Sequence, residues 1–537
     1  MEESRYSSKT LDHLGLIAGL MKEIGVSEVI DSCYGEQSPD QIVSNGKALE
    51  AMIINGLGFV NKRLYLIPKF FEDKPLSRLL GDGFEAGHFN DDRLGRALDA
   101  FYASGVTALF AKLSRRTFEV LGHKPTQGHL DTTTLSAYGE YNSASEEPVE
   151  LHITQGYSKD HRPDLAQATL QLICDNLSGI PIYMEALDGN SNDSVSFREA
   201  IEKFGQQLQA VDGLRTIVAD SKLYSSATLQ ALKESGLNWV CRVPGSIEGL
   251  KKLLSKVEPG MLTALPSEGY SSKCYTYTYG GVDQHWVVYH SEKAAEREAA
   301  TLERQLKKEY GAAQKSLKKL QKDIFHCRED ALNAVEKWNE GFKSVRLKDP
   351  VVHKHTEFEK PADGSGELKP ILTYSLSGNL QHDEQAFARA VFRRSLFVLA
   401  TNEEVATLQE EESLLNTYKA QHTVERGFRF IKDPAVVASS FYVKKPERVE
   451  ALLFMMASCL LIYTALEHRI RQALQKQDKT IPDQKGKPTK NPTTRWVFQL
   501  FVGIHVLELP NGKQMTLNLK QEHRDILSLL SYWNVYS

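Results

Sequence analysis

Cysteine is scarce in this sequence, and no two cysteines are spaced as a pair of metal ligands. The six cysteines lie far apart and form no C-x-x-C motif. They are Cys33, Cys174, Cys241, Cys274, Cys327 and Cys459. Structural zinc sites take their ligands in close pairs, and disulfide scaffolds concentrate cysteine in short secreted chains. The pattern therefore excludes a zinc module and predicts a reduced, cytoplasmic environment.

The sequence also lacks an excess of positive charge. Its 65 lysines and arginines stand against 69 aspartates and glutamates, which gives a formal net charge of −4. A protein that covers nucleic acid with most of its surface carries a strong basic excess. Any surface for nucleic acid must therefore be local.

No hydrophobic run is long enough to cross a bilayer. The longest, residues 451–466, lies between Glu450 and Glu467 and has 16 residues, whereas about 20 are needed. We expect a buried core helix there. The first residues, MEESRYSSKT, place no apolar stretch behind a basic start, so the sequence predicts neither a secretory signal nor a membrane segment.

What is present is a chain of 537 residues, more than one hydrophobic core usually supports. Residues 1–125 have helical apolar spacing, as in residues 48–60 and 92–113. They predict an all-helical N-terminal domain. Paired helices around residues 88–92 fit a helix-turn-helix, although such folds are also common in proteins that never touch DNA. We expect this domain to bind DNA mainly because of the sequence that follows it.

Strand patterns begin at residue 126. Three apolar runs separated by turn residues are followed by a helix, a strand (215–220), a helix and a strand. This is the order of an RNase H-like α/β core, a mixed sheet flanked by helices. We assign its first part to residues 126–244 and its second part, which carries a further strand and helix, to residues 393–470.

Residues 245–392 interrupt the core and predict an α+β insertion. A strand-rich patch is followed by a long charged helix that we expect to run from Ser291 to about Phe342, with one narrow apolar seam. A solvated arm is the preferred interpretation, and a specific DNA contact is the alternative. Trp286 fits a packed strand residue better than a platform for an unpaired base.

The last segment, residues 471–537, predicts a C-terminal basic loop and tail. Residues 469–495 hold eight lysines and arginines against two aspartates, with several prolines and a glycine. The composition is typical of a flexible basic loop, which either tracks phosphates or is simply solvated.

Two aspartates stand at strand ends of the predicted core. Asp131 follows the apolar start of one strand, and Asp220 closes the run Ile217–Val218–Ala219. These strands are neighbours in an RNase H-like sheet, and two carboxylates that converge repel each other unless a cation intervenes. Glu425, on the helix after the resumed strand, is the candidate third ligand. Among 69 acidic residues some fall at strand ends by chance, so the ordered triple is the stronger signal.

Six ordered blocks resemble bacterial insertion-sequence transposases of the DDE type, in the insertion-sequence-four superfamily and its sixteen-thirty-four group. The blocks are HLDTTTLSAYG, GYSKDHRPDL, IPIYMEALDGNSND, IVADSK, LFVLATNEE and YKAQHTVERGFRFIK. The resemblance covers residues 128–470. It implies a catalytic triad of Asp131, Asp220 and Glu425 that holds two Mg²⁺ ions, with Mn²⁺ as a substitute. Asp131 would bridge both ions.

The resemblance extends to a signature around the catalytic Glu. Its Tyr, Glu and Lys match Tyr418, Glu425 and Lys432, but Gln421 stands where the family has Arg. In related enzymes the Tyr and basic residues grip the phosphates of the transposon end and help to resolve a hairpin intermediate. Gln421 lacks the charge and rigid fork of Arg, which puts the hairpin route in doubt. Lys159, His161 and Arg162 match a further block, either as phosphate contacts or as residues that shape a loop.

The sequence thus predicts a metal-dependent DNA transposase. It would cleave the terminal inverted repeats of its element, join the freed 3′ hydroxyls to target DNA, and act as a homodimer on DNA in the cytoplasm, associated with the nucleoid. A transposase-derived DNA-binding protein without catalysis and an RNase H-like nuclease without strand transfer are the alternatives.

Overall fold

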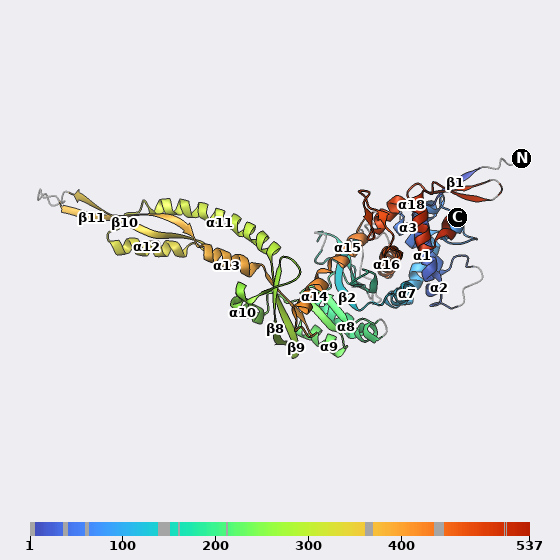
Figure 1. The fold of residues 1–537 in the computed structure, drawn as a ribbon, viewed down its shortest axis with the longest axis horizontal. Helices are drawn as coiled ribbons and strands as arrows, with labels where there is room; N and C mark the ends of the chain where they lie inside the picture. Colours follow the sequence, from blue (N-terminus) through green and yellow to red (C-terminus); the bar gives the residue numbers. More distant parts are fainter. Residues whose placement is uncertain are drawn as a thin grey trace.

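The computed structural model describes residues 6–35, 41–59, 64–137, 151–158, 162–210, 213–359, 369–433, 445–509, 511 and 513–537. The molecule is elongated, with a rounded body at one end and a narrow arm at the other (Figure 1). The first described strand, residues 7–10, and the C-terminus lie in the body, at the end farthest from the arm.

The N-terminal region is helical, as predicted, apart from one short strand. Its helices are α1 (Leu14–Ile24), α2 (Val26–Asp31), α3 (Asn45–Leu57), α4 (Ile67–Phe71), α5 (Leu76–Leu79), α6 (Asp91–Ala103) and α7 (Val106–Leu121), with 3-10 turns η1 (Leu64–Leu66) and η2 (Ala86–Phe89). The side chains of Ser44 and Asn90 cap α3 and α6 by accepting backbone N–H groups. The exception is β1 (Ser7–Thr10), whose partner β15 (His505–Glu508) lies at the far end of the chain. The expectation of an all-helical domain missed β1 because nothing local indicates so distant a partner.

A nine-stranded mixed sheet forms the centre of the molecule, in the order β4-β3-β2-β5-β6-β12-β9-β8-β7. Its strands are β2 (Gln127–Ala137), β3 (Ala166–Asp175), β4 (Pro181–Leu187), β5 (Thr216–Ala219), β6 (Asn238–Arg242), β7 (Thr263–Ala264), β8 (Tyr270–Tyr279), β9 (Val282–Ser291) and β12 (Leu396–Thr401). The parallel pairs are β2–β5 and β5–β6, and the other pairs are antiparallel. The sequence order of strands and helices from β2 to β6 is the one predicted.

The sheet continues across the predicted start of the insertion at residue 245. Strand β12 pairs with β6 on one edge and with β9 on the other, so β7, β8 and β9 extend the central sheet. Trp286, on β9, is fully buried and stacks on Tyr277, which agrees with its interpretation as a packed residue. Of the predicted insertion, only the segment after β9 extends out of the body to form the arm.

Helices cover both faces of the sheet, because alternate residues of a strand point to opposite sides. On β5, Ile217 and Ala219 belong to the large core that includes α8 (Asp193–Ala210) and α9 (Ser226–Glu234). Val218 points the other way, into a cluster with Leu414 and Leu415 of α14 (Leu408–Lys419). Burial on both faces explains why β5 is apolar apart from Thr216.

The arm consists of two helices packed on a β-ribbon. Its elements are α11 (Glu292–Leu320), α12 (Arg328–Glu340), β10 (Val345–Glu359), β11 (Lys369–His382) and α13 (Glu384–Arg394), and α10 (Glu248–Lys256) and η3 (Pro259–Met261) lie near its base. A small core holds it together, formed by Leu317, Ala331, Val335, Leu347 and Leu376. The expectation of one helix to about Phe342 was wrong. Phe325 exchanges two backbone hydrogen bonds with Tyr374 of β11, so the chain is extended there and α12 begins anew.

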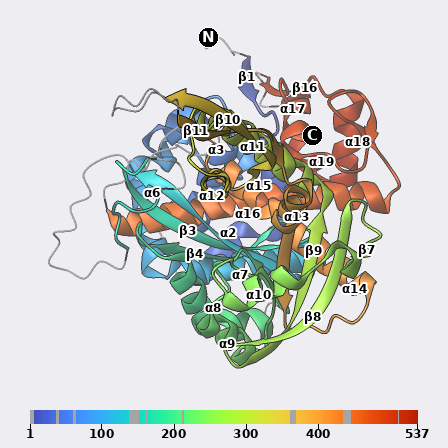
Figure 2. The ribbon, with the colours of Figure 1, turned by 90° about the vertical axis from the view of Figure 1, so that its left-hand side faces the viewer.

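The apolar run predicted as a core helix lies in α16 (Pro446–Lys476). By length and composition alone α16 would suffice to cross a membrane, but 78% of its most apolar window is buried inside the protein. It packs against α1, α3, α6, α7 and β4. Figure 2 shows it crossing the body among these helices.

The C-terminal segment is folded, in contrast to the expected basic loop and tail. After α16 come β13 (Ile481–Pro482), β14 (Pro488–Thr489), α17 (Thr494–Leu500), β15, β16 (Gln514–Leu517), α18 (Gln521–Leu530) and α19 (Trp533–Tyr536). The Asp483 carboxylate accepts the backbone N–H groups of Lys485 and Lys487, which closes the β13–β14 turn. Tyr536 donates its hydroxyl to the Asp12 carbonyl at 2.6 Å. The composition did not show that this segment packs on the N-terminal helices.

Candidate active site

Asp131 and Asp220 lie next to each other, just past the stretch over which β2 and β5 pair in parallel; Asp220 follows the end of β5, as predicted, but Asp131 lies within β2, which continues to Ala137. His129 of β2 pairs with Val218 of β5, and each aspartate stands two residues farther along the chain. Residues in register point to the same face of a sheet, here the face that α14 covers. Asp131 accepts the backbone N–H of Thr132 at 2.7 Å, and Asp220 accepts that of Lys222 at 2.9 Å. Both carboxylates are half-buried.

A lysine and a third aspartate adjoin this pair. The ammonium group of Lys222 forms an ion pair with Asp193, the first residue of α8, and Asp193 also accepts the Thr132 hydroxyl at 2.8 Å. Burial lowers the pKa of Lys222, but the hydrogen bond to Asp193 and the charges of Asp193, Asp220 and Asp131 outweigh it, so the pKa is raised. A cation is therefore already accommodated among three carboxylates.

Glu425 lies in the first turn of α15 (His422–Ile431), which contacts β2. Val424, Phe428 and Ile431 form the buried side of this helix, at the spacing of one helical face. The Glu425 side chain is 55% exposed and lies 3.9 Å from the guanidinium of Arg429. Packing of the apolar side thus leaves the Glu425 carboxylate in solvent.

Tyr418 lies close enough to both Asp220 and Glu425 for its phenol to interact with their charges. It lies in the last turn of α14 and packs against the cluster of Val218 and Leu415. Burial raises the pKa of its phenol, Arg242 lowers it, and the charges of Asp220 and Glu425 raise it further. The phenol therefore remains protonated at neutral pH, near two of the three predicted acidic residues.

Gln421 and Lys432 flank α15. Gln421 is its N-cap and accepts the backbone N–H groups of Val424 and Glu425 with its carbonyl, and Lys432 is its C-cap. Both lie close to the Glu425 side of the helix, since they stand four residues before and seven residues after it. Their DNA-binding role stays a prediction.

The three predicted carboxylates do not form one closed cluster. Within the described ranges, no group of three or more His, Cys, Asp or Glu side chains is arranged to hold a metal ion. Asp131 and Asp220 are brought together, whereas Glu425 extends toward Arg429. A shared site would require the exposed Glu425 side chain to turn toward the strand ends.

The block that contains Lys159, His161 and Arg162 is described only in part. Lys159 and His161 lie outside the described residues. Arg162 forms two hydrogen bonds with Asp164, at 2.9 and 2.7 Å, which lower the pKa of that exposed carboxyl. A role in phosphate binding for the three residues stays a prediction.

The sequence analysis missed Asp193 and Lys222. Both stand inside quoted blocks, Asp193 at the end of IPIYMEALDGNSND and Lys222 at the end of IVADSK. The available signal was weak: each is a charged residue at the end of its block, and Lys222 lies two residues after the candidate ligand Asp220. The ion pair between Lys222 and Asp193 could not be predicted, because it depends on where α8 begins in space relative to β5.

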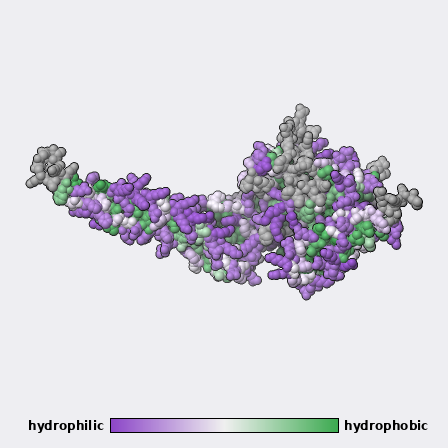
Figure 3. All heavy atoms as spheres, turned by 90° about the horizontal axis from the view of Figure 1, so that it is seen from above, coloured by the Kyte–Doolittle hydropathy of each residue, from purple (hydrophilic) through white to green (hydrophobic). Residues whose placement is uncertain are grey.

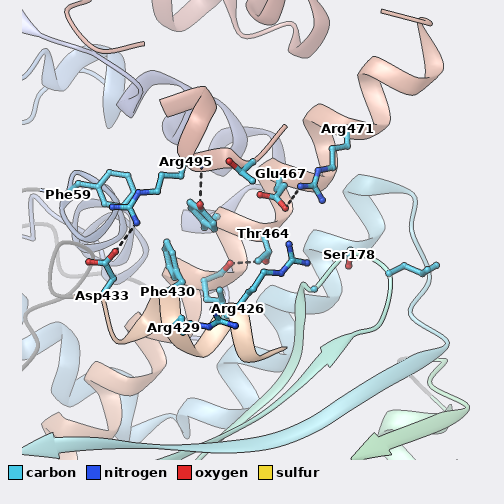
Figure 4. Close-up of a pocket in the computed structure, with 16 residues that line it drawn as sticks. Phe59, Ser178, Arg426, Arg429, Phe430, Asp433, Thr464, Glu467, Arg471 and Arg495 are labelled. Carbon is cyan, nitrogen blue, oxygen red and sulfur yellow. Dashed lines mark hydrogen bonds and ion pairs between the residues drawn. The ribbon is translucent and has the colours of Figure 1, made fainter. Parts of the chain in front are cut away.

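A pocket of about 340 Å³ opens beside α15, α16 and α17 (Figure 4). Its lining includes Arg426 and Arg429 of α15, Arg471 of α16 and Arg495 of α17. Arg471 pairs with Glu467 at 2.7 Å and Arg495 with Asp433 at 3.1 Å. Arg426 makes no ion pair or hydrogen bond with the described part of the chain. Guanidinium groups match the geometry of phosphate oxygens, so the pocket suits an anion.

Comparison with known families accounts for most of the chain. Residues 123–462 match the model of the "Transposase DDE domain", which is more than half of the sequence. The chain belongs to the DDE transposase family. Residues 6–115 match a second model, "Domain of unknown function (DUF4277)". No curated protein matches the transposase chain.

Among solved structures, the transposase is similar to a cryo-EM structure of the piggyBac transposase synaptic complex with hairpin DNA. The TM-score is 0.38 and the sequence identity 10%, over 99% of this chain and 88% of that one. The DDE match runs from just before β2 into α16 and contains Asp131, Asp220 and Glu425. The helices α1 to α6 fall in the second matched region, and α17 to α19 fall outside both.

Proposed function

We propose that this DDE transposase cleaves the ends of an insertion sequence and joins the freed 3′ hydroxyls to target DNA. The observation that carries the proposal is the register of β2 and β5, which puts Asp131 and Asp220 side by side within the DDE domain. The five strands β4-β3-β2-β5-β6, with β2, β5 and β6 parallel, support an RNase H-like core. The resemblance to the insertion-sequence-four superfamily and its sixteen-thirty-four group, of bacterial origin, belongs to the same proposal.

The donor set fits divalent ions of the magnesium type. Carboxylate oxygens are hard ligands, and such ions keep free positions for water and phosphate. The Lys222 ammonium offsets only part of the negative charge of Asp131, Asp220 and Asp193, so the site retains an excess of carboxylates for metal ions. Asp131 and Asp220 would hold the ions, with Glu425 completing the set from α15. When bound, two Mg²⁺ or Mn²⁺ ions activate the attacking oxygen and stabilise the leaving oxygen.

The surrounding residues would orient the DNA strand. Tyr418 keeps its proton and can donate it in a hydrogen bond to a phosphate oxygen, while Gln421 can donate only a neutral hydrogen bond. Lys432 adds a cation on the same side of α15. Water attacks the phosphodiester at the transposon end, and the 3′ hydroxyl then attacks target DNA. Because Gln421 lacks the charge of the Arg that it replaces, the proposal does not include a hairpin intermediate.

The partners follow from this reaction. The protein would bind double-stranded DNA, both the terminal inverted repeats and the target, and it would pair with a second copy to hold two ends together. We propose that it works in the cytoplasm, on the nucleoid. The N-terminal helices are the proposed reader of the ends.

One assay tests the proposal and separates it from its alternatives. Duplexes carrying the DNA that flanks the encoding reading frame are incubated with the protein, a target plasmid and Mg²⁺ or Mn²⁺. We expect cleavage at the ends and joined products. Cleavage without joining would identify a nuclease, and binding without cleavage would identify a non-catalytic DNA-binding protein.

The site assignment is tested by Asp131→Asn and Glu425→Gln. A bound metal ion contributes several kcal/mol of transition-state stabilisation, so we expect each variant to lose roughly 10³-fold in cleavage rate. The matched control is Glu404→Gln, which neutralises an exposed carboxylate just after β12. Unchanged cleavage by Asp131→Asn would remove that residue from the catalytic set.

A further inference from the structure

Helix α11 of the arm divides its charges by sign. Ala313 and Leu317 face the small core of the arm and are buried. At 3.6 residues per turn, the opposite side of the helix, an arc of about 120°, carries lysine and arginine and no acidic residue. We call this side the basic face. Its eight cations are Lys293, Arg297, Arg304, Lys307, Lys308, Lys315, Lys318 and Lys319.

The eight cations of the basic face are exposed. Within the described ranges none of them forms an ion pair. The acidic residues of α11 lie off the basic face, and two of them are engaged elsewhere. Glu298 pairs with Arg394 at 3.5 Å, and Glu309 accepts the backbone N–H groups of Lys343 and Ser344 at 2.6 and 2.8 Å. The other three, Glu292, Glu296 and Glu303, border the basic face, and no ion pair joins them to it among the described residues. The eight cations therefore remain available to an external anion.

The residues between the cations are small. Ala300, Thr301 and Gly311 complete the basic face. A Cβ atom added at Gly311 would meet nothing within 4 Å, so packing within the chain does not require glycine there. Glycine in a helix costs about 0.5–1 kcal/mol relative to alanine, and it permits close approach of a ligand. Between its charged side chains the basic face therefore carries only small side chains, which allow a ligand to approach the helix backbone.

The dimensions of the basic face match a DNA duplex. Residues 293–319 of a helix span roughly 39 Å at 1.5 Å per residue, about one turn of B-DNA. The duplex presents about one negative charge per 1.7 Å of its axis. In Figure 1 α11 runs along the upper edge of the arm with β10, β11 and α12 below it. Seen from above, hydrophilic residues predominate along much of the arm (Figure 3).

A membrane surface fits less well than DNA. A helix that binds a bilayer presents an apolar face to it, but the apolar side of α11 is occupied by the core of the arm. A straight row of cations with no apolar rim is typical of phosphate-backbone contacts, which position DNA without reading its sequence.

We infer that the basic face of α11 binds the phosphate backbone of a DNA duplex that extends beyond the active site. This inference rests on the proposed function, because the transposase reaction supplies DNA as the ligand. It replaces the interpretation of the arm as a merely solvated element. The arm lengthens the DNA-binding surface without adding sequence specificity.

The test compares two triple variants of the full-length protein. The first, Lys307→Gln, Lys308→Gln and Lys315→Gln, removes three charges from the basic face. The control, Lys337→Gln, Lys343→Gln and Lys354→Gln, removes three exposed charges elsewhere on the arm. Binding of a labelled duplex of about 30 base pairs and arbitrary sequence is followed by fluorescence anisotropy over a range of salt concentrations. Each phosphate contact contributes about 0.9 to the slope of log K against log salt, so the first variant should lower the slope by about 2 to 3.

Each result decides the matter. A lower slope for the first variant and an unchanged slope for the control support the basic face. Equal effects of the two variants, or no effect of the first, would overturn it, as would loss of binding to anionic phosphatidylserine vesicles with DNA binding intact. Circular dichroism checks that both variants are folded. The readout needs no cleavage, so failure of the proposed catalytic function is recognised separately.

Discussion

The sheet that carries Asp131 and the arm that carries α11 arrange charge in opposite ways. Beside Asp131 and Asp220 the single Lys222 ammonium lies among three carboxylates, so part of their negative charge is offset within the chain. On α11 charges of one sign occupy one side of a helix, and their balance must come from outside. The comparison teaches that an internal cation lets acidic residues lie close together in the metal-free fold, whereas charge of one sign on an exposed helix face is available for a partner of opposite charge.

The largest expected difference between the two regions concerns packing. Leu415 of α14 is fully buried beneath Val218 of β5, two residues before Asp220, whereas Leu317 belongs to the small core of the arm. Replacement of a buried Leu by Ala costs about 2–5 kcal/mol. We expect Leu415→Ala to lower hydrogen-exchange protection throughout β5, β6 and β12, and Leu317→Ala to lower it only in α11, α12, β10 and β11.

Hydrogen exchange measured by mass spectrometry on both variants distinguishes these patterns. If Leu317→Ala also reduced protection in β5, the arm and the sheet would unfold as one unit. The proposed separation between a folded catalytic sheet and an independent arm would then be wrong.

The sequence predicted the sheet where the signals are local. Apolar runs and turn residues gave the order β2, β3, β4, α8, β5, α9 and β6, and the ends of parallel strands gave the neighbours Asp131 and Asp220. The partner of β12 could not be predicted, because β9 joins it only after the chain has returned from the arm. The break between α11 and α12 depends on a bridge from Phe325 to Tyr374, nearly fifty residues away.

The candidate site was predictable to the same extent. Strand position indicated Asp131 and Asp220, but the direction of the Glu425 side chain depends on how α15 packs against β2. Lys222 was hidden for a different reason. Its ammonium group pairs with Asp193, which is 29 residues earlier in the chain and also accepts the Thr132 hydroxyl, so the contact depends on tertiary packing.

A smaller effect tests whether Lys222 offsets the negative charge of the carboxylates around it. We expect Lys222→Met to destabilise the metal-free protein by about 1 kcal/mol, since the pair is partly exposed and solvent screens its charges. The side chain of Lys222 is 43% exposed and that of Asp193 is 11% exposed. Addition of Mn²⁺ should raise the melting temperature of the variant more than that of the wild type, because the ion then supplies the missing positive charge.

Thermal unfolding in chelator and in Mn²⁺ measures this difference, with Lys233→Met on α9 as the control for removal of an exposed lysine. Equal Mn²⁺ shifts in the wild type and Lys222→Met would mean that Lys222 does not act as the counter-ion of the aspartates.

The smallest expected effect concerns Gly311, which lowers the stability of α11 but lets DNA approach the helix closely. Its Cβ position is open, so Gly311→Ala meets no atom of the chain, and the substitution should stabilise α11 by about 0.5–1 kcal/mol. If the basic face binds duplex DNA closely, the added methyl group should nevertheless weaken DNA binding slightly while hydrogen exchange in α11 slows. Gly260→Ala, in η3, whose Cβ position is also open, serves as the control away from the basic face. Tighter DNA binding by Gly311→Ala would show that glycine is not kept there for close approach, and that the cations alone define the surface.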